Sequence, residues 1–212
     1  MCGNASRCIG KYAYEKGLTD KTEITLETLA GVKTLRLDAE NGRVNSVEVD
    51  MGTASFCCAD VPAVGIGESA VLLPLTVCDR QWNITAVSVG NPHCVVFTRD
   101  IEKLDLPRIG AEFEKHPAFP ERINTEFVEL IDKTHLKMRV WERGSGETLA
   151  CGTGACAVVS AAVKCGFCPA DSFITVSLIG GELSVMCRRD YSLVMRGGAN
   201  FVFEGEIPDA FG

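Results

Sequence analysis

Short stretches of alternating apolar and polar residues dominate the hydrophobic pattern of the chain. In residues 22–28, Ile24 and Leu26 share one face and polar side chains share the other. A period of two is typical of a half-buried β-strand. The alternation recurs in residues 32–37, 44–49, 135–141, 173–178, 183–187 and 201–203. The pattern therefore predicts a protein in which strands outnumber helices.

Two segments open with a capping residue and close before a glycine, as helices commonly do. They are residues 5–16, between Asn4 and Gly17, and residues 154–165, between Thr153 and Gly166. The second segment has no polar face, which predicts a helix buried on all sides. A weaker helical pattern covers residues 106–114.

The two helical segments belong to an internal repeat. The spacing from Cys2 to Gly17 equals the spacing from Cys151 to Gly166. Each cysteine is followed by a glycine, and each helix is followed by a strand and a glycine turn. This joint match predicts two related lobes, each with a helix packed against strands and a cysteine at the helix start.

Cysteines at helix starts suggest a specific chemistry. A helix N-terminus has free backbone N–H groups and the positive end of the helix dipole. A thiol there is expected to ionise more readily than a free thiol, and the N–H groups can hold a carboxylate. If a pseudo-twofold axis relates the lobes, Cys2 and Cys151 face each other across a cleft. One thiolate then removes the proton next to a carboxylate and the opposite thiol returns one, which inverts the stereocentre without a cofactor.

The composition of the chain excludes several classes of binding partner. The chain of 212 residues has 21 Lys and Arg against 28 Asp and Glu, a net charge of −7 that argues against nucleic acid. We expect no membrane span, no signal peptide and a cytoplasmic location. Most of the eleven cysteines have apolar neighbours, which favours buried free thiols. Cys165 and Cys168 are a close pair, but no second such pair accompanies them, so we predict no metal.

Four stretches resemble the diaminopimelate epimerase family. They are MCGNASRC at residues 1–8, GNPHCVVF at 90–97, FPERINTEFVE at 119–129 and WERGSGETLACGTGACA at 141–157. The resemblance implies an α+β fold of two pseudo-symmetric lobes, each with a central helix wrapped by mainly antiparallel strands. It assigns residues 1–50, with a returning strand in 198–212, to a remnant of the first lobe, and residues 51–197 to the second. Because family members have about 70 further residues before Met1, we expect the first lobe to be incomplete.

The resemblance also implies a function. The family interconverts LL- and meso-2,6-diaminopimelate without a cofactor, in lysine and peptidoglycan precursor biosynthesis. Cys2 and Cys151 would be the two acid/base thiols, and His93 and Glu142 would tune them. The residues implied to bind substrate are Gly3, Asn4, Asn91, Asn124, Glu142, Arg143, Gly152 and Thr153. A homodimer is implied, with Phe203 at its interface in place of the family's usual tyrosine.

Other interpretations stay open. The chain could be a relative of proline racemases or of phenazine-type isomerases, although the ERGSGETLACGTG and NPHCV stretches are closer to the diaminopimelate enzymes. It could also be a non-catalytic remnant that keeps the fold as a binding module. Deuterium exchange at the substrate's α-carbon separates an enzyme from such a remnant.

Overall fold

The strands of the computed structural model, which describes residues 2–206, form one sheet. They are β1 (Glu23–Thr28), β2 (Gly31–Glu40), β3 (Arg43–Thr53), β4 (Leu73–Val77), β5 (Arg80–Ser88), β6 (Pro92–Phe97), β7 (Asn124–Leu130), β8 (His135–Glu142), β9 (Gly146–Thr148), β10 (Phe173–Leu178), β11 (Gly181–Cys187) and β12 (Ser192–Gly197). The helices in the same residues are α1 (Gly3–Glu15), α2 (Leu106–Glu114), α3 (Gly152–Lys164) and the short 3₁₀ helix η1 (Ile101–Lys103). The expected excess of strands over helices is confirmed.

The sheet is mainly antiparallel. Its order is β1-β2-β3-β12-β11-β10-β8-β7-β6-β5-β4, with β9 paired to β8. The parallel pairs in this part of the chain are β8 with β10 and β6 with β7. Few helices on a mixed sheet make an α+β fold, as the resemblance implies.

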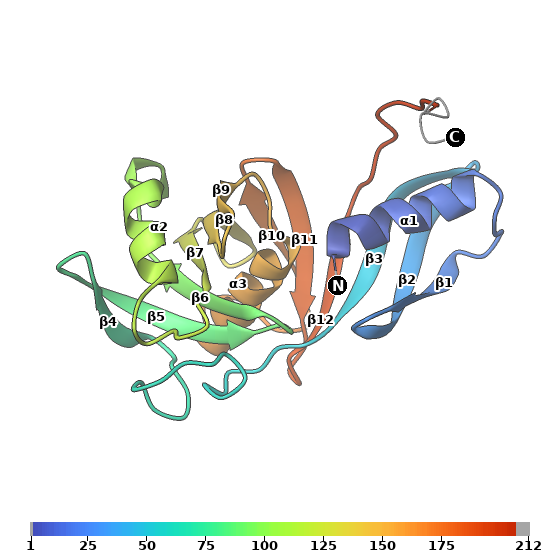
Figure 1. The fold of residues 1–212 in the computed structure, drawn as a ribbon. Coiled ribbons are helices and arrows are strands. Elements are labelled where there is room, and N and C mark those ends of the chain that lie inside the picture. Colours follow the sequence, from blue (N-terminus) through green and yellow to red (C-terminus); the bar gives the residue numbers. More distant parts are fainter. Residues whose placement is uncertain (1, 207–212) are drawn as a thin grey trace.

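The internal repeat is visible in the sheet (Figure 1). The first repeat unit is α1 with β1, β2 and β3, and the second is α3 with β10, β11 and β12. The units meet where β3 pairs antiparallel with β12, from Thr53 opposite Ser192 to Val47 opposite Gly197. The strand order on one side of this junction is repeated on the other, which confirms the two related units.

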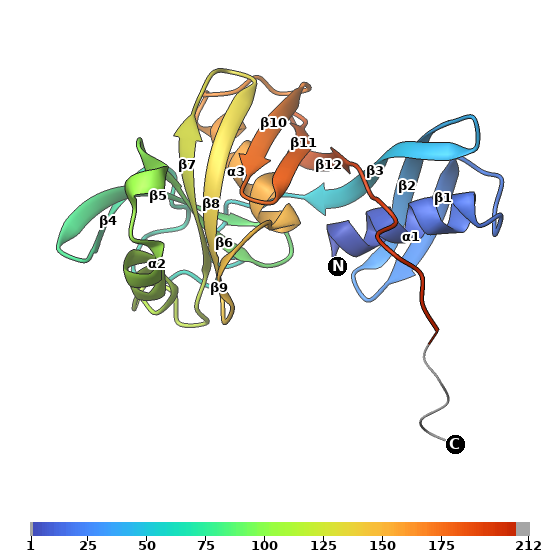
Figure 2. The same cartoon turned by 90° about the horizontal axis from the view of Figure 1, so that it is seen from above.

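Helix α3 lies in the middle of the second half of the molecule (Figure 2). It contacts β5, β6, β7, β10, β11 and β12, and all its residues from Gly154 to Ala162 are buried. Small side chains let the strands come close. The prediction of a helix buried on all sides is confirmed. A second core beneath α2 is built on Trp82, Phe113 and Phe127, whose rings lie 5.5–5.9 Å apart.

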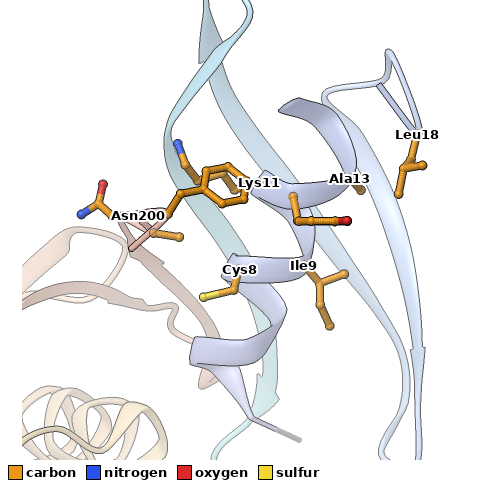
Figure 3. Close-up of a pocket in the computed structure, with 9 residues that line it drawn as sticks. Cys8, Ile9, Lys11, Ala13, Leu18 and Asn200 are labelled. Atoms are coloured by element: carbon orange, nitrogen blue, oxygen red, sulfur yellow. The ribbon is translucent and has the colours of Figure 1, made fainter. Parts of the chain in front are cut away.

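Helix α1 is covered on one side only. It packs on β2 and β3, while Ile9 and Tyr12 on its outer side are 45% and 51% exposed. A shallow cavity of about 370 Å³ lies there, between α1 and the segment after β12 (Figure 3). Ile24 and Leu26, by contrast, are half-buried against the main core. The first repeat unit therefore has an incompletely covered helix.

The segment after β12 corrects one expectation. Residues 198–206 contain no strand, so the strand predicted over 201–203 is wrong, and residues 207–212 lie outside the described residues. This segment runs past α1, with the Phe201 ring 6.2 Å from that of Tyr12 and an ion pair between Lys16 and Glu204. Alternation over three residues is too short to specify pairing. The division of the chain at residue 50 stays a prediction, and β3 itself continues to Thr53.

Candidate active site

Cys2 and Cys151 occupy equivalent positions, each as the N-cap of a 13-residue helix. Both have extended backbones, and their carbonyl oxygens accept the first helical hydrogen bonds, from Ser6 N and Ala155 N. The expected caps, Asn4 and Thr153, are instead the second residues of α1 and α3. The reason is that the glycine after each cysteine is already helical, so both helices begin earlier than the capping residues suggest.

The two helix starts meet at the side chain of Met195, which belongs to β12. A Cβ atom on Gly3 would clash with Met195 Cε, and one on Gly152 would lie 3.3 Å from Met195 Sδ. Both cysteines are therefore brought to the junction of the repeat units. Their exposure differs, because Cys2 is exposed and Cys151 is buried.

A chain of hydrogen bonds leads from β6 to the Cys151 sulfur. His93 Nε2 lies 3.1 Å from Asn91 Oδ1, and Asn91 Nδ2 donates to Thr153 Oγ1 at 3.3 Å. Thr153 Oγ1 lies 3.5 Å from Cys151 Sγ. The sulfur also accepts the backbone N–H of Gly154 at 3.4 Å. Four of the predicted site residues, Asn91, His93, Cys151 and Thr153, are thus brought together.

Glu126 is a site residue that the sequence reasoning missed. Its Oε1 lies 2.7 Å from His93 Nδ1, and neither side chain is exposed. The signal available in the sequence was a glutamate among the apolar residues of a strand, a position where a charged side chain is costly unless it has a partner.

Asn124, Glu142 and Arg143 form a separate group at the ends of β7 and β8. Asn124 Nδ2 donates to Pro92 O at 2.8 Å and its Oδ1 accepts from Arg143 N at 2.9 Å. The Arg143 guanidinium is exposed and donates to Glu121 O at 3.0 Å. Glu142 accepts a hydrogen bond from Thr148. In this structure the Asn124 amide thus holds loop backbone in place.

Two cavities flank the helix starts. One, of about 410 Å³, is lined by Asn91, Thr153 and Lys33, among others. The other, of about 400 Å³, is lined by Asn4, Arg7 and Gly152, among others. Of the residues expected to bind substrate, Asn91 and Thr153 therefore line one cavity, and Asn4 and Gly152 line the other.

At Cys151, electrostatics correct the expectation that a thiol at a helix start ionises more readily than a free thiol. Burial, followed by the charge of Glu126, raises the pKa of Cys151 from 9.0 to about 12, although the hydrogen bonds from Thr153 and Gly154 act in the opposite direction. Glu142 adds to the rise. The helix N-terminus is thus outweighed at Cys151 by desolvation and two carboxylates.

Several further expectations concern metals, membranes and assembly. Residues 2–206 contain no cluster of three or more His, Cys, Asp or Glu side chains able to hold a metal. Within the same range, no helix is long and apolar enough to span a bilayer. The Phe203 side chain is 85% exposed in the segment after β12. Its role in a dimer interface stays a prediction.

Comparison with known sequences places this site in a family. The profile of the family "Diaminopimelate epimerase" matches residues 1–57 and 85–202. Diaminopimelate epimerase from Methanococcus maripaludis is 48% identical over 208 residues, which cover 98% of this chain and 74% of that protein. The enzyme of the same name from Desulfovibrio desulfuricans is 50% identical over 213 residues, which cover 97% and 74%.

Solved structures support the same fold. A probable proline racemase from Agrobacterium radiobacter superposes with a TM-score of 0.67 at 16% identity, over 100% of this chain and 69% of that one. A PhzF-family phenazine biosynthesis protein from Bacillus anthracis gives 0.59 at 17% identity, over 92% and 71%. At these identities the likeness concerns the fold alone. The sequence matches go further, and by them the chain belongs to the diaminopimelate epimerase family.

Proposed function

We propose that this protein inverts one α-carbon of 2,6-diaminopimelate, between the LL and meso forms, with Cys2 and Cys151 as the two acid/base groups. The observation that carries the proposal is their equivalent placement as N-caps of two helices that meet at Met195. Relatives at 48–50% identity are named diaminopimelate epimerase, which supports this substrate.

The reaction consists of two proton transfers, one from the substrate and one to it, and it leaves the total charge unchanged. A thiolate on one side takes the α-proton and becomes a thiol. The substrate then carries a carbanion next to its carboxylate. The second sulfur, a thiol, donates its proton to the opposite face and becomes a thiolate. The configuration is inverted, and the two sulfurs have exchanged protonation states, so the reverse reaction uses the same groups.

The helix starts supply the groups that bind the carboxylate. The first backbone N–H groups of a helix have no partner within it, so those of Gly3 and Asn4 in α1, and of Gly152 and Thr153 in α3, are suited to an anion. Negative charge that develops on the carboxylate in the transition state strengthens these bonds. We assign Asn91, Asn124, Glu142 and Arg143 to the amino and carboxylate groups of the substrate, and His93 and Glu142 to tuning of the thiols.

The experiment is an isotope exchange in D₂O with the full chain. Incubation with LL-diaminopimelate should place deuterium at the inverted α-carbon, as read by mass spectrometry and NMR. Cys2→Ala and Cys151→Ala should each abolish inversion, while Cys8→Ala, a change at an exposed cysteine of the same helix as Cys2, should not. Inversion that survives in either variant with an intact circular dichroism spectrum rules out the two-thiol assignment.

We also propose that the protein forms a homodimer through the segment after β12. Phe203 and Val202 are 85% and 88% exposed there, an apolar surface that a second copy would cover. Sedimentation at micromolar concentration should give a dimer that Phe203→Glu weakens, with Glu204→Gln as the control. A monomer at that concentration contradicts the assignment.

A cytoplasmic location completes the proposal. All eleven cysteines are free, and the mechanism needs two of them reduced. The cytosol keeps thiols in that state. Fractionation of the source cells should recover the protein with cytosolic enzymes.

A further inference from the structure

A carboxylate that is shielded from solvent lies beside Cys151. The Glu126 side chain is fully buried on β7, and its Oε2 has no hydrogen-bond partner. Its Oε1 faces His93 Nδ1 at 2.7 Å. A buried unpartnered carboxylate oxygen is costly, so its presence beside the site calls for a functional explanation.

The carboxylate is directed at the first turn of α3. A Cβ on Gly154 would lie 2.8 Å from Glu126 Oε1 and 3.3 Å from Cys151 Sγ. The same turn donates Gly154 N–H to that sulfur. Glu126 and Cys151 therefore share one helix start. A negative charge on the sulfur would stand next to the negative charge of Glu126, which opposes it.

The start of α1 carries the opposite charge. Arg7 is buried, and in residues 2–206 it forms no ion pair with a carboxylate. It donates to Asn4 Oδ1 at 3.3 Å, to Gly198 O at 3.2 Å and to Met195 Sδ at 3.8 Å, and its charge interacts with Cys8 first, then with Cys2 and with Cys156 of α3. An arginine stays charged at any pH of interest, so the start of α1 holds a fixed positive charge where the start of α3 faces a negative one.

We propose that Glu126 and Arg7 are positioning residues that make the two sulfurs unequal, with Cys2 as the base and Cys151 as the proton donor when substrate meets the free protein. The proposal rests on the two-thiol function above. Glu126 acts through the first turn of α3 and through His93, and Arg7 acts through the first turn of α1.

The other charged groups near Cys151 act with Glu126 or are distant from it. Glu142 on β8 adds a second negative charge, and Cys156 lies one turn further along α3. His93 on β6 is held by Glu126 itself. Arg7 acts on the α3 side through Cys156 rather than through Cys151. Removal of the Glu126 charge should therefore favour a thiolate at Cys151.

The test measures the reactivity of each sulfur in the free protein, without substrate. Iodoacetamide reacts with thiolates, and peptide mass spectrometry reports the alkylation rate of Cys151 separately from the other cysteines. Glu126→Gln keeps the shape and removes the charge, so the rate at Cys151 at pH 8 should rise by about tenfold. Glu126→Asp keeps the charge on a shorter side chain, further from Cys151, so its alkylation rate should lie between the rates of the parent and of Glu126→Gln. Glu129→Gln, the same change on the same strand at a half-buried position, should have no effect.

Arg7 provides the second arm. Arg7→Gln should slow alkylation of Cys2, and Arg7→Lys, which keeps the charge, should restore it. Arg36→Gln, at an exposed arginine of β2, is the control.

The test compares the alkylation rate of Cys151 in a Glu126 variant with the rate in the parent protein, so one folded Glu126 variant is enough to decide it. A rate at Cys151 that is unchanged or lower in Glu126→Gln, or in Glu126→Asp if only that variant folds, overturns the proposal. Because alkylation needs no turnover, this result is independent of the D₂O experiment. A protein that fails to invert diaminopimelate but shows the expected order would lose its proposed function and keep its unequal thiols.

Discussion

A Cβ atom on Gly3 or on Gly152 would meet the same side chain, that of Met195, although the two glycines lie far apart in the sequence. Met51 Cε also lies 3.4 Å from the position of a Cβ on Gly3. The backbones of the two helix starts therefore both come close to the Met195 side chain of β12, Gly3 more closely than Gly152. This close approach gives a physical reason for the glycine that follows each N-cap cysteine.

Gly3→Ala should reduce the free energy of unfolding by at most about 1 kcal/mol, because the added methyl group displaces only the end of the Met195 side chain and alanine suits the helix better than glycine. In a Met195→Ala background the same change should cost much less, since the smaller side chain leaves room. Urea denaturation of the four proteins of this double-mutant cycle measures the coupling. Gly205→Ala, where no atom lies within 4 Å of the added methyl group, is the control. Strictly additive costs would show that Gly3 and Met195 do not compete for space.

Buried thiols should make the protein sensitive to alkali. Burial raises the pKa of Cys168 and of Cys187 to about 11 and of Cys151 to about 12, and it also raises the pKa values of Cys94 and Cys156. A group whose pKa is higher in the folded state contributes stability that is present below its unfolded pKa, here about 9. That stability is lost as the pH rises through the folded value. The free energy of unfolding should therefore fall steadily above pH 9.

Cys156→Ala tests this dependence, because it removes one fully buried thiol from α3. The variant loses packing at pH 7.5, but the fall in unfolding free energy between pH 7.5 and pH 10.5 should be smaller by about 2 kcal/mol than in the parent. Val158→Ala, at another fully buried residue of the same helix, removes no titratable group and should leave the fall unchanged. Both comparisons use urea denaturation under reducing conditions. Equal falls in parent and Cys156→Ala would contradict the linkage.

Local patterns specified the parts of the fold that carry local signals. The Cys-Gly pairs, the glycines after the helices and the alternating strands identified both repeat units and the positions of Cys2 and Cys151. Helix α2 (Leu106–Glu114) matches its predicted bounds. These features depend on residues close together in the sequence, so no tertiary information was needed.

The pattern of alternating residues did not predict the strands that are covered on both faces. β6 and β7 are almost continuously buried and show no alternation, because α3 covers one face and the second core covers the other. Glu126 lies within such a strand, which explains why its link to His93 could not be read from the sequence. The raised pKa of Cys151 has the same origin, since burial and a carboxylate from a distant strand decide it. In these places tertiary packing outweighs local signals.

The Thr153 hydroxyl should matter for chemistry rather than for folding. It links Asn91 to the Cys151 sulfur, whereas the backbone N–H of Thr153 is the group we assign to the carboxylate. Thr153→Val keeps the shape and the N–H and removes the link, so kcat for epimerisation should fall by about 10- to 100-fold with a smaller change in KM. Thr153→Ser should retain most activity. Equal kcat in Val and Ser variants would show that the hydroxyl does not act on the sulfur.

Thr125 offers a gain in stability next to the site. Its side chain on β7 is fully buried, and its hydroxyl oxygen has no hydrogen-bond partner. Thr125→Val replaces that hydroxyl by a methyl group of similar size and suits a strand, so the free energy of unfolding should rise by about 1 kcal/mol. Thr85→Val on β5 is the matched control, since the equally buried Thr85 hydroxyl accepts Leu72 N–H at 3.2 Å and its loss should destabilise the protein. Urea denaturation measures the free energy of unfolding of both variants. If it changes in the same direction in both, the presence or absence of a hydrogen-bond partner for the hydroxyl does not decide the change in stability.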